Sequence, residues 1–318
     1  MVKSPRGIAK ESKTPSRNFK LVGASATGAS HINKGIPNQD AYYIKVLSEG
    51  SDGNTSAKLF CLADGHGSKR CFRSHLGSNM AVLAMAEAFE AHLPKLRTLI
   101  GKVDSAALKN GIVGVGQPPM EGLRPLAEMS LKLWVNKVMV HLRENPFQSE
   151  EVDALDYAGR RALGSNALLA YGSTLIGVLI FDNIMVGVNL GDGDLMVYTK
   201  KQCFHYRHED SHTIADQTYS LCTSGALAYW HYTVRSLDDV EAVFAATDGY
   251  RNSYKNLKGF EQVGTDLIKQ SAKKGSQMIE DNWPEWLSET SRYGSGDDIT
   301  AVIALIDTGK KEKKRLWR

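Results

Sequence analysis

The chain of 318 residues can hold one large domain or two small ones, and its hydrophobic content of 42% is ordinary for a globular protein. Its net charge of +4 is uneven: basic residues exceed acidic ones by five in residues 1–20 and by five in residues 310–318, so the remainder is acidic by six. The four cysteines lack CxxC or metal-finger spacing, which argues against a secreted, disulfide-bonded protein and predicts a cytoplasmic protein with free thiols. No apolar run is long enough to span a bilayer, which argues against a membrane protein.

Eight short runs rich in β-branched and aromatic residues predict strands. Several runs are separated only by turns, such as Asp182-Asn183, and this spacing implies antiparallel pairing because parallel strands need long crossovers. In chain order the predicted strands are residues 19–25, 41–47, 57–63, 173–180, 183–190, 195–200, 240–247 and 298–306.

Helical periodicity appears in two blocks between these strands. Residues 101–121 lose periodicity and gather Gly and Pro, which predicts a loop insertion within the first block. The pattern predicts an α+β fold in which antiparallel sheet carries helices. The predicted helices are residues 78–93, 122–144, 259–274 and 283–291; the expected division is one domain over 19–308 with disordered basic tails at 1–18 and 309–318.

Five places along the chain put an aspartate at the end or beginning of an apolar strand beside small residues. Each alone is typical of a turn, but five together predict more than turns. Carboxylates that converge from strand ends form an oxygen-only site, which suits Mg²⁺ or Mn²⁺ rather than zinc. Two such ions roughly 3.5–4 Å apart clamp a phosphoryl group, as in phosphatases and nucleases. The aspartates are Asp40, Asp64, Asp192, Asp248 and Asp297, the last followed by Asp298.

The ordered motifs NQDAYYI, LADGHG, GSTL, NLGDGDLMVY, AATDGY and GDDITAVIAL resemble those of the metal-dependent protein phosphatases of the PP2C family. The segment GASHINKGIPNQDA is more similar to the bacterial-type branch of this family. The resemblance runs from about residue 22 to residue 306. It implies a sandwich of two antiparallel sheets flanked by helix pairs, and hydrolysis of phosphoserine and phosphothreonine in proteins by a water activated at a dinuclear Mg²⁺ or Mn²⁺ centre.

The resemblance also implies a role for each matching residue. Asp64 would bridge two metal ions, and the carbonyl of Gly65 would bind one of them. His66 would be the general acid for the leaving serine or threonine oxygen. The remaining metal residues are Asp248 and Asp297, which complete the other ion's ligands, Asp40, which acts through a water on the metal, and Asp192, which helps to hold a third, weaker ion.

The sequence departs from the family pattern in several places. Gly35 stands where many members carry a phosphate-binding arginine, so Lys34 or His31 is the candidate cation for the substrate phosphate. Gln39 replaces a common glutamate, and Gly193-Asp194 follows the GD turn in place of Ser-Arg. Asp298 is expected to cap a strand rather than to bind metal. The cluster His205, His208, Glu209, Asp210 and His212 fits no zinc spacing and is expected to be a solvated loop.

Two other functions remain open. The missing arginine is compatible with a pseudophosphatase that acts as a regulatory or binding module. The basic tails are compatible with nucleic-acid binding, whose mark would be an affinity that falls steeply with salt and is lost with the tails. The favoured hypothesis is an active phosphatase that is monomeric, acts on phosphorylated proteins alongside a cognate serine/threonine kinase, and binds neither membrane nor nucleic acid.

Overall fold

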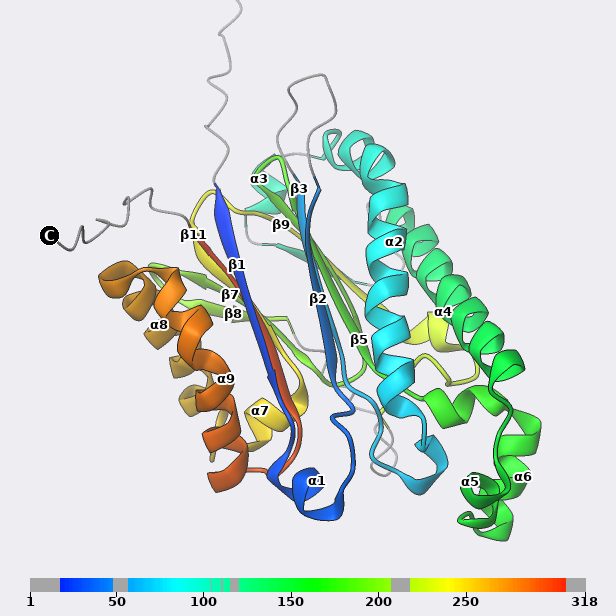
Figure 1. The fold of residues 1–318 in the computed structure, drawn as a ribbon. Helices are drawn as coiled ribbons and strands as arrows, with labels where there is room; N and C mark the ends of the chain where they lie inside the picture. Colours follow the sequence, from blue (N-terminus) through cyan, green and yellow to red (C-terminus); the bar gives the residue numbers. More distant parts are fainter. Residues whose placement is uncertain are drawn as a thin grey trace, which may run out of the picture.

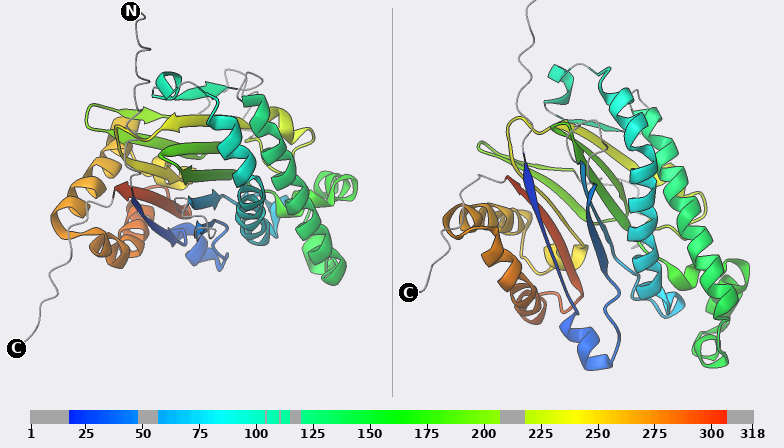
Figure 2. Two further views of the ribbon diagram at one scale, coloured as in Figure 1. Left: turned by 90° about the horizontal axis from the view of Figure 1, so that it is seen from above. Right: turned by 45° about the horizontal axis from the view of Figure 1, so that its top comes forward.

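The computed structural model describes residues 18–47, 57–103, 105–109, 111–114, 120–206 and 218–306. Two antiparallel sheets lie face to face, and a pair of long helices covers the outer face of each sheet (Figure 1). The two further views in Figure 2 show the same order of layers. This arrangement confirms the predicted α+β class with two antiparallel sheets flanked by helix pairs.

The first sheet has the strand order β1-β11-β10-β7-β8, with every pairing antiparallel. Its first and last strands in the sequence, β1 and β11, are neighbours over their whole length. Its strands are β1 (Phe19–Ala26), β7 (Asp194–Thr199), β8 (Cys203–His205), β10 (Val240–Ala246) and β11 (Ile299–Ile306).

The second sheet has the strand order β2-β3-β5-β6-β9-β4. Asp182 and Asn183 form a two-residue turn between β5 and β6, with φ angles of 45° and 64°. Such positive φ angles are typical of the tight turns that join antiparallel strands, so the predicted hairpin is confirmed. The strands are β2 (Ala41–Leu47), β3 (Ala57–Ala63), β4 (Ile112–Gly114), β5 (Leu175–Phe181), β6 (Ile184–Leu190) and β9 (His231–Ser236).

The long helices α2 (Ser74–Ile100) and α4 (Arg124–Glu144) lie on the second sheet, and α8 (Leu257–Lys274) and α9 (Ser276–Tyr293) lie on the first. Buried side chains accordingly form three clusters, one between the sheets and one under each helix pair. No helix in the described part of the chain has the length and apolar character needed to cross a bilayer. The short helices are α1 (Ala29–Lys34), α3 (Ser105–Leu108), α5 (Ser149–Asp153), α6 (Tyr157–Ser165) and α7 (Asp248–Asn252).

Three strands were not predicted. Two of them, β4 and β8, have only three residues each, which is too short for a periodic signal. The segment 101–121 was expected to be a loop, but it contributes α3 and the edge strand β4. The third, β9, was missed because it contains polar residues that are buried in the structure. The Arg235 side chain is fully buried, donates a hydrogen bond to the Tyr206 hydroxyl, and stacks with its Cζ 4.0 Å from the centroid of the Phe204 ring.

Some expectations fall on residues that are not described. Residues 1–17 and 307–318, which make up nearly all of the two basic tails, lie outside the described ranges, as does most of the histidine cluster at 207–217. His205 is described and is treated below. All four cysteines are free, as their spacing predicted.

Candidate metal centre

Strand pairing brings the five acidic corners together at one end of the sandwich. Asp40 precedes β2 and Asp64 follows β3, and the pairing of Ala41 with Ala63 sets these two aspartates side by side. At the same end of the sandwich, Asp248 follows the end of β10, and Asp297 and Asp298 precede the beginning of β11. The turn that contains Asp192 leads into β7, where Asp194 pairs with Ala246 of β10.

Asp64 lies at the centre of this group. Burial raises the pKa of its carboxyl, and the nearby carboxylates of Asp40, Asp248 and Asp192 raise it further. The largest causes of this shift are burial and neighbouring acids. The Asp64 backbone is fixed by Thr174, which accepts from the Asp64 amide through Oγ1 at 3.1 Å and donates its own amide to the Asp64 carbonyl at 2.8 Å.

Gly65 allows the DGHG segment to pass close to two other segments. A β-carbon at this position would lie 2.6 Å from the Gln39 carbonyl oxygen and 2.9 Å from the Ser74 carbonyl oxygen. The Gly65 amide donates to the Gln39 carbonyl, and the Gly65 carbonyl oxygen accepts no hydrogen bond from the described residues. The glycine is therefore required by close packing, and its carbonyl is available to a ligand.

Asp40 is held from the opposite sheet. The Thr247 hydroxyl donates to Asp40 Oδ2 at 2.7 Å, and the Asp40 side chain is buried. Burial raises the pKa of Asp40 well above its ordinary value, and the carboxylates of Asp298 and Asp297 add to this effect against the Thr247 bond. The Thr247 and Thr300 hydroxyls both lower this pKa, but neutral hydroxyls do not balance a buried charge as a cation would.

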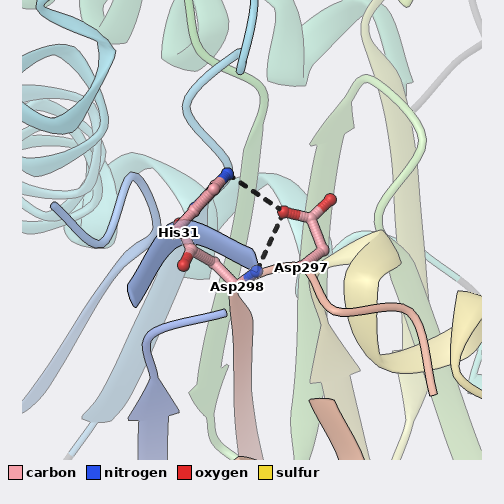
Figure 3. Close-up of side chains that lie close together, drawn as sticks. All are labelled: His31, Asp297 and Asp298. Carbon is pink, nitrogen blue, oxygen red and sulfur yellow. Dashed lines mark hydrogen bonds and ion pairs between the residues drawn. The ribbon is translucent and has the colours of Figure 1, made fainter. Parts of the chain in front are cut away.

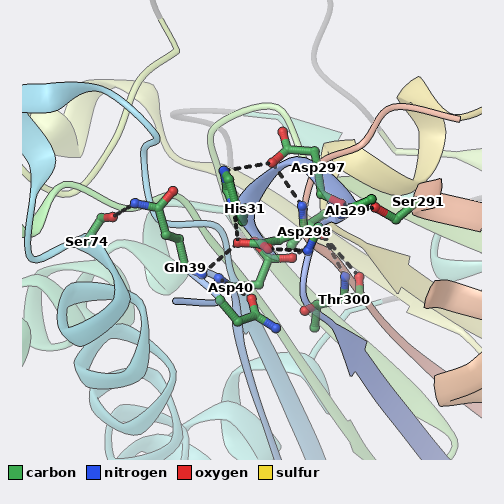
Figure 4. Close-up of polar contacts among 12 residues, drawn as sticks. Ala29, His31, Gln39, Asp40, Ser74, Ser291, Asp297, Asp298 and Thr300 are labelled. Carbon is green, nitrogen blue, oxygen red and sulfur yellow. Dashed lines mark hydrogen bonds and ion pairs between the residues drawn. The ribbon is translucent and has the colours of Figure 1, made fainter. Parts of the chain in front are cut away.

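Asp297 and Asp298 have separate environments, although they are adjacent (Figure 3). The Asp298 carboxylate is buried and accepts the backbone amides of Gly28 at 2.6 Å and Gln39 at 2.7 Å (Figure 4). Both carboxylate oxygens of Asp298 thus accept hydrogen bonds from backbone amides that are distant in the sequence. We had expected Asp298 instead to cap the beginning of its own strand. The Asp297 side chain is about half exposed, with its Oδ1 accepting the Asp298 amide at 2.9 Å. Asp297 is therefore the one that can bind a ligand.

The two candidate phosphate cations differ in position. His31 Nδ1 lies 3.0 Å from Asp298 Oδ2, and Nε2 lies 3.8 Å from Asp297 Oδ1. These three side chains gather closely enough to hold an ion, but the Asp298 oxygens already accept two amides. Lys34 is exposed in the last turn of α1 and forms no ion pair within the described ranges.

Asp192 and His66 lie close enough to interact electrostatically. Thr218 Oγ1 donates to Asp192 Oδ2 at 2.9 Å, while burial and the Asp248 carboxylate raise the pKa of Asp192. Burial lowers the pKa of His66, and the Asp192 carboxylate opposes that shift. The His66 amide donates to the Gly172 carbonyl at 3.1 Å, which fixes the backbone that carries the ring.

The sequence did not predict a network next to this centre. Asp194 is fully buried; His205 Nε2 lies 2.8 Å from its Oδ1, and Arg251 Nε donates to its Oδ2 at 3.0 Å. The next residue in α7, Asn252, donates to Asp248 Oδ2 at 2.9 Å. The signal that could have revealed the network is the replacement of the family's Ser-Arg by Gly193-Asp194, since an aspartate in a buried strand requires a cation.

This donor set fits hard divalent cations. Its members are carboxylates and one free carbonyl, the ligands that Mg²⁺ and Mn²⁺ prefer. Burial and neighbouring carboxylates raise the pKa of Asp40, Asp64 and Asp192, which is the electrostatic state that bound cations would relieve. The donor types at this centre therefore suit divalent metal ions, and among the described residues His31, Asp297 and Asp298 are the three whose ligand atoms lie within 4.8 Å of one another.

We expect the metal-free protein to lose stability at this site as the pH rises. The folded state raises the pKa of Asp40, Asp64 and Asp192, so the stability that they contribute is full below their unfolded pKa of about 3.9 and is lost as pH rises through the raised values. In the presence of EDTA, the melting temperature of the wild type should therefore fall relative to that of Asp64→Asn between mildly acidic and neutral pH. A difference that does not change with pH would contradict this expectation.

Comparisons with known proteins give a consistent result. The sequence model of the family described as protein phosphatase 2C matches residues 27–288. The solved structure of a bacterial serine phosphatase matches with a TM-score of 0.54 and 16% sequence identity, and the match covers 91% of this chain and 98% of that protein. The structure of the serine/threonine phosphatase Stp1 from Staphylococcus aureus matches with a TM-score of 0.53 and 15% identity, and this match covers 95% of this chain and 100% of that protein. No curated protein matches the sequence. At these identities the solved structures show a shared fold.

Proposed function

Because the chain belongs to the protein phosphatase 2C family, we propose that it hydrolyses phosphoserine and phosphothreonine in proteins at a centre of two Mg²⁺ or Mn²⁺ ions. The observation that carries this proposal is the cluster of carboxylates around Asp64, whose pKa is raised chiefly by burial and by the neighbouring acids Asp40, Asp248 and Asp192. Such a cluster is costly without cations and becomes favourable with them.

The family resemblance implies which residues would hold the ions. Asp64 is central and would contact both ions, and the free carbonyl of Gly65 would bind one of them. Asp248 and Asp297 would complete the second ion's ligands, with Asp40 close by and Asp192 toward a third ion. When bound, the ions stabilise charge on the transferring phosphoryl group and lower the pKa of the attacking water.

The chain's own groups would supply the remaining chemistry. His66 would donate a proton to the leaving serine or threonine oxygen, because its ring lies by Asp192 at the edge of the centre. Acid catalysis of this kind contributes roughly 10²–10⁴-fold. We propose Lys34 rather than His31 as the cation for the substrate phosphate, since His31 is engaged with Asp298 while Lys34 is exposed. The cytoplasmic location, the monomeric state and the kinase partner stay predictions of the sequence.

The test is hydrolysis of a phosphothreonine peptide with Mn²⁺ or Mg²⁺ against the same reaction in EDTA, with calorimetry to count bound ions. We expect turnover that requires metal and at least two binding sites. A protein that bound Mn²⁺ by calorimetry and released no phosphate would overturn the proposal in favour of the pseudophosphatase alternative. A matching phosphotyrosine peptide, which is expected to react far more slowly, controls for the substrate class.

A further inference from the structure

A basic pocket of about 760 Å³ opens beside the metal centre, outside the aspartate cluster. It lies between the end of β8, helix α7 and the beginning of α8. Among the described residues, the lining includes three groups that can carry positive charge and no carboxylate. Its residues are His205, Arg251, Asn252, Tyr254, Lys255, Asn256 and Leu257.

Side chains of the pocket contact one candidate metal residue and a residue next to the metal centre. Asn252 lines it and donates to Asp248 Oδ2, so one side chain joins the pocket to a candidate metal ligand. Arg251 and His205 also line it, and both contact Asp194, two residues beyond Asp192. A peptide whose phosphorylated residue lay at the aspartates would therefore extend over this pocket within a few residues.

The charges in the pocket differ in how far they are already balanced. Arg251 and His205 both contact the buried carboxylate of Asp194, which holds them in place. Lys255 is exposed and has no ion-pair partner among the residues that the structure describes. The lining is thus positively charged overall, and Lys255 is its uncompensated cation.

Resting on the proposed function, we propose that this pocket binds a second anionic group of the phosphoprotein substrate, namely a carboxylate or a further phosphoryl group that flanks the phosphorylated residue. Oxygen anions are the partners that lysine and arginine bind in exposed sites. The enzyme would therefore prefer phosphosites in an acidic context. Because the pocket is open to solvent, the preference should be moderate and should weaken as salt is added.

The experiment measures kcat/KM with Mn²⁺ for phosphothreonine peptides that carry glutamate, phosphoserine or glutamine at each flanking position in turn. We expect the wild type to prefer an anion over glutamine at one or more positions. Lys255→Gln should reduce that preference about two- to fivefold, with kcat/KM for the small substrate p-nitrophenyl phosphate unchanged. Lys273→Gln makes the same charge change in the last turn of α8, far from the pocket, and should keep the wild-type preference.

The outcomes separate this inference from the function on which it rests. A wild type without preference for an anion at any position, or a Lys255→Gln variant that keeps the full preference, overturns the pocket's role while leaving the phosphatase intact. If no substrate reacts with the wild type, it is the proposed function that fails. A response to phosphoserine alone would identify the anion as a second phosphoryl group, and a response to glutamate would identify a carboxylate.

Discussion

Replacing Asp64 by asparagine should abolish turnover without unfolding the protein. Asp64 is the carboxylate that interacts with Asp40, Asp248 and Asp192 at once, so its loss removes the charge that would be shared between the ions. We expect kcat/KM for a phosphothreonine peptide to fall by more than about 10⁴-fold, which exceeds the roughly 10²–10⁴-fold that an acid-base histidine such as His66 contributes. Steady-state kinetics at saturating Mn²⁺ check this.

Thermal denaturation distinguishes a lost site from a lost fold. Without metal, Asp64→Asn should melt no lower than the wild type, since the variant removes one of several mutually repelling buried carboxylates. With Mn²⁺, the wild type should gain stability that the variant does not. Asp153→Asn, an exposed aspartate in α5, is the matched control and should behave as the wild type in both assays. A variant that unfolded without metal, or one that retained turnover, would refute the central role of Asp64.

Gly249→Ala should damage both stability and the metal centre. A β-carbon at Gly249 would lie 2.1 Å from the Asp298 carbonyl oxygen, so α7 would have to move away from the beginning of β11. Overpacking of this kind costs about 1–3 kcal/mol, which corresponds to a fall in melting temperature of about 2–12 °C. The movement separates Asp248 from Asp297, so the affinity for Mn²⁺ measured by calorimetry should fall at least about tenfold.

Gly164→Ala is the control for the glycine substitution. Gly164 lies in α6, where a β-carbon would meet nothing within 4 Å. Alanine is a better helix former than glycine, so this variant should gain up to about 1 kcal/mol and keep its metal affinity. If Gly249→Ala proved as stable as Gly164→Ala, the close contact between α7 and β11 would not constrain the site.

The sequence predicted the sheet framework and the candidate site because both depend on local patterns. Each of the eight predicted strands is a run of apolar residues, and each metal aspartate stands next to the end of such a run. The hairpin at Asp182-Asn183 was predictable for the same reason, since residues that tolerate positive φ interrupt an apolar stretch. Strand β9 escaped prediction because the buried Arg235 depends on Phe204 and Tyr206, which lie about 30 residues earlier in the chain.

The contacts that arrange the site could not be predicted, because they join residues far apart in the sequence. Asp194 and Arg251 are 57 residues apart, and only the pairing of β7 with β10 brings them together. The engagement of His31 with Asp298 likewise depends on the position of α1 against the beginning of β11. Pattern and spacing identify which residues carry chemistry, whereas tertiary packing decides which neighbours they have.

The Asp298 carboxylate sets an order of events during synthesis of the chain. It accepts hydrogen bonds from the amides of Gly28, 270 residues earlier, and Gln39, 259 residues earlier. Gln39 directly precedes Asp40, and its carbonyl accepts the Gly65 amide. The segment around residue 298 must leave the ribosome before β11 can pair with β1 and before the loop ahead of β2 can take its final course. A nascent chain that ends before residue 297 lacks one of the five candidate metal aspartates and the carboxylate that holds Gly28 and Gln39, so the candidate site cannot assemble in it.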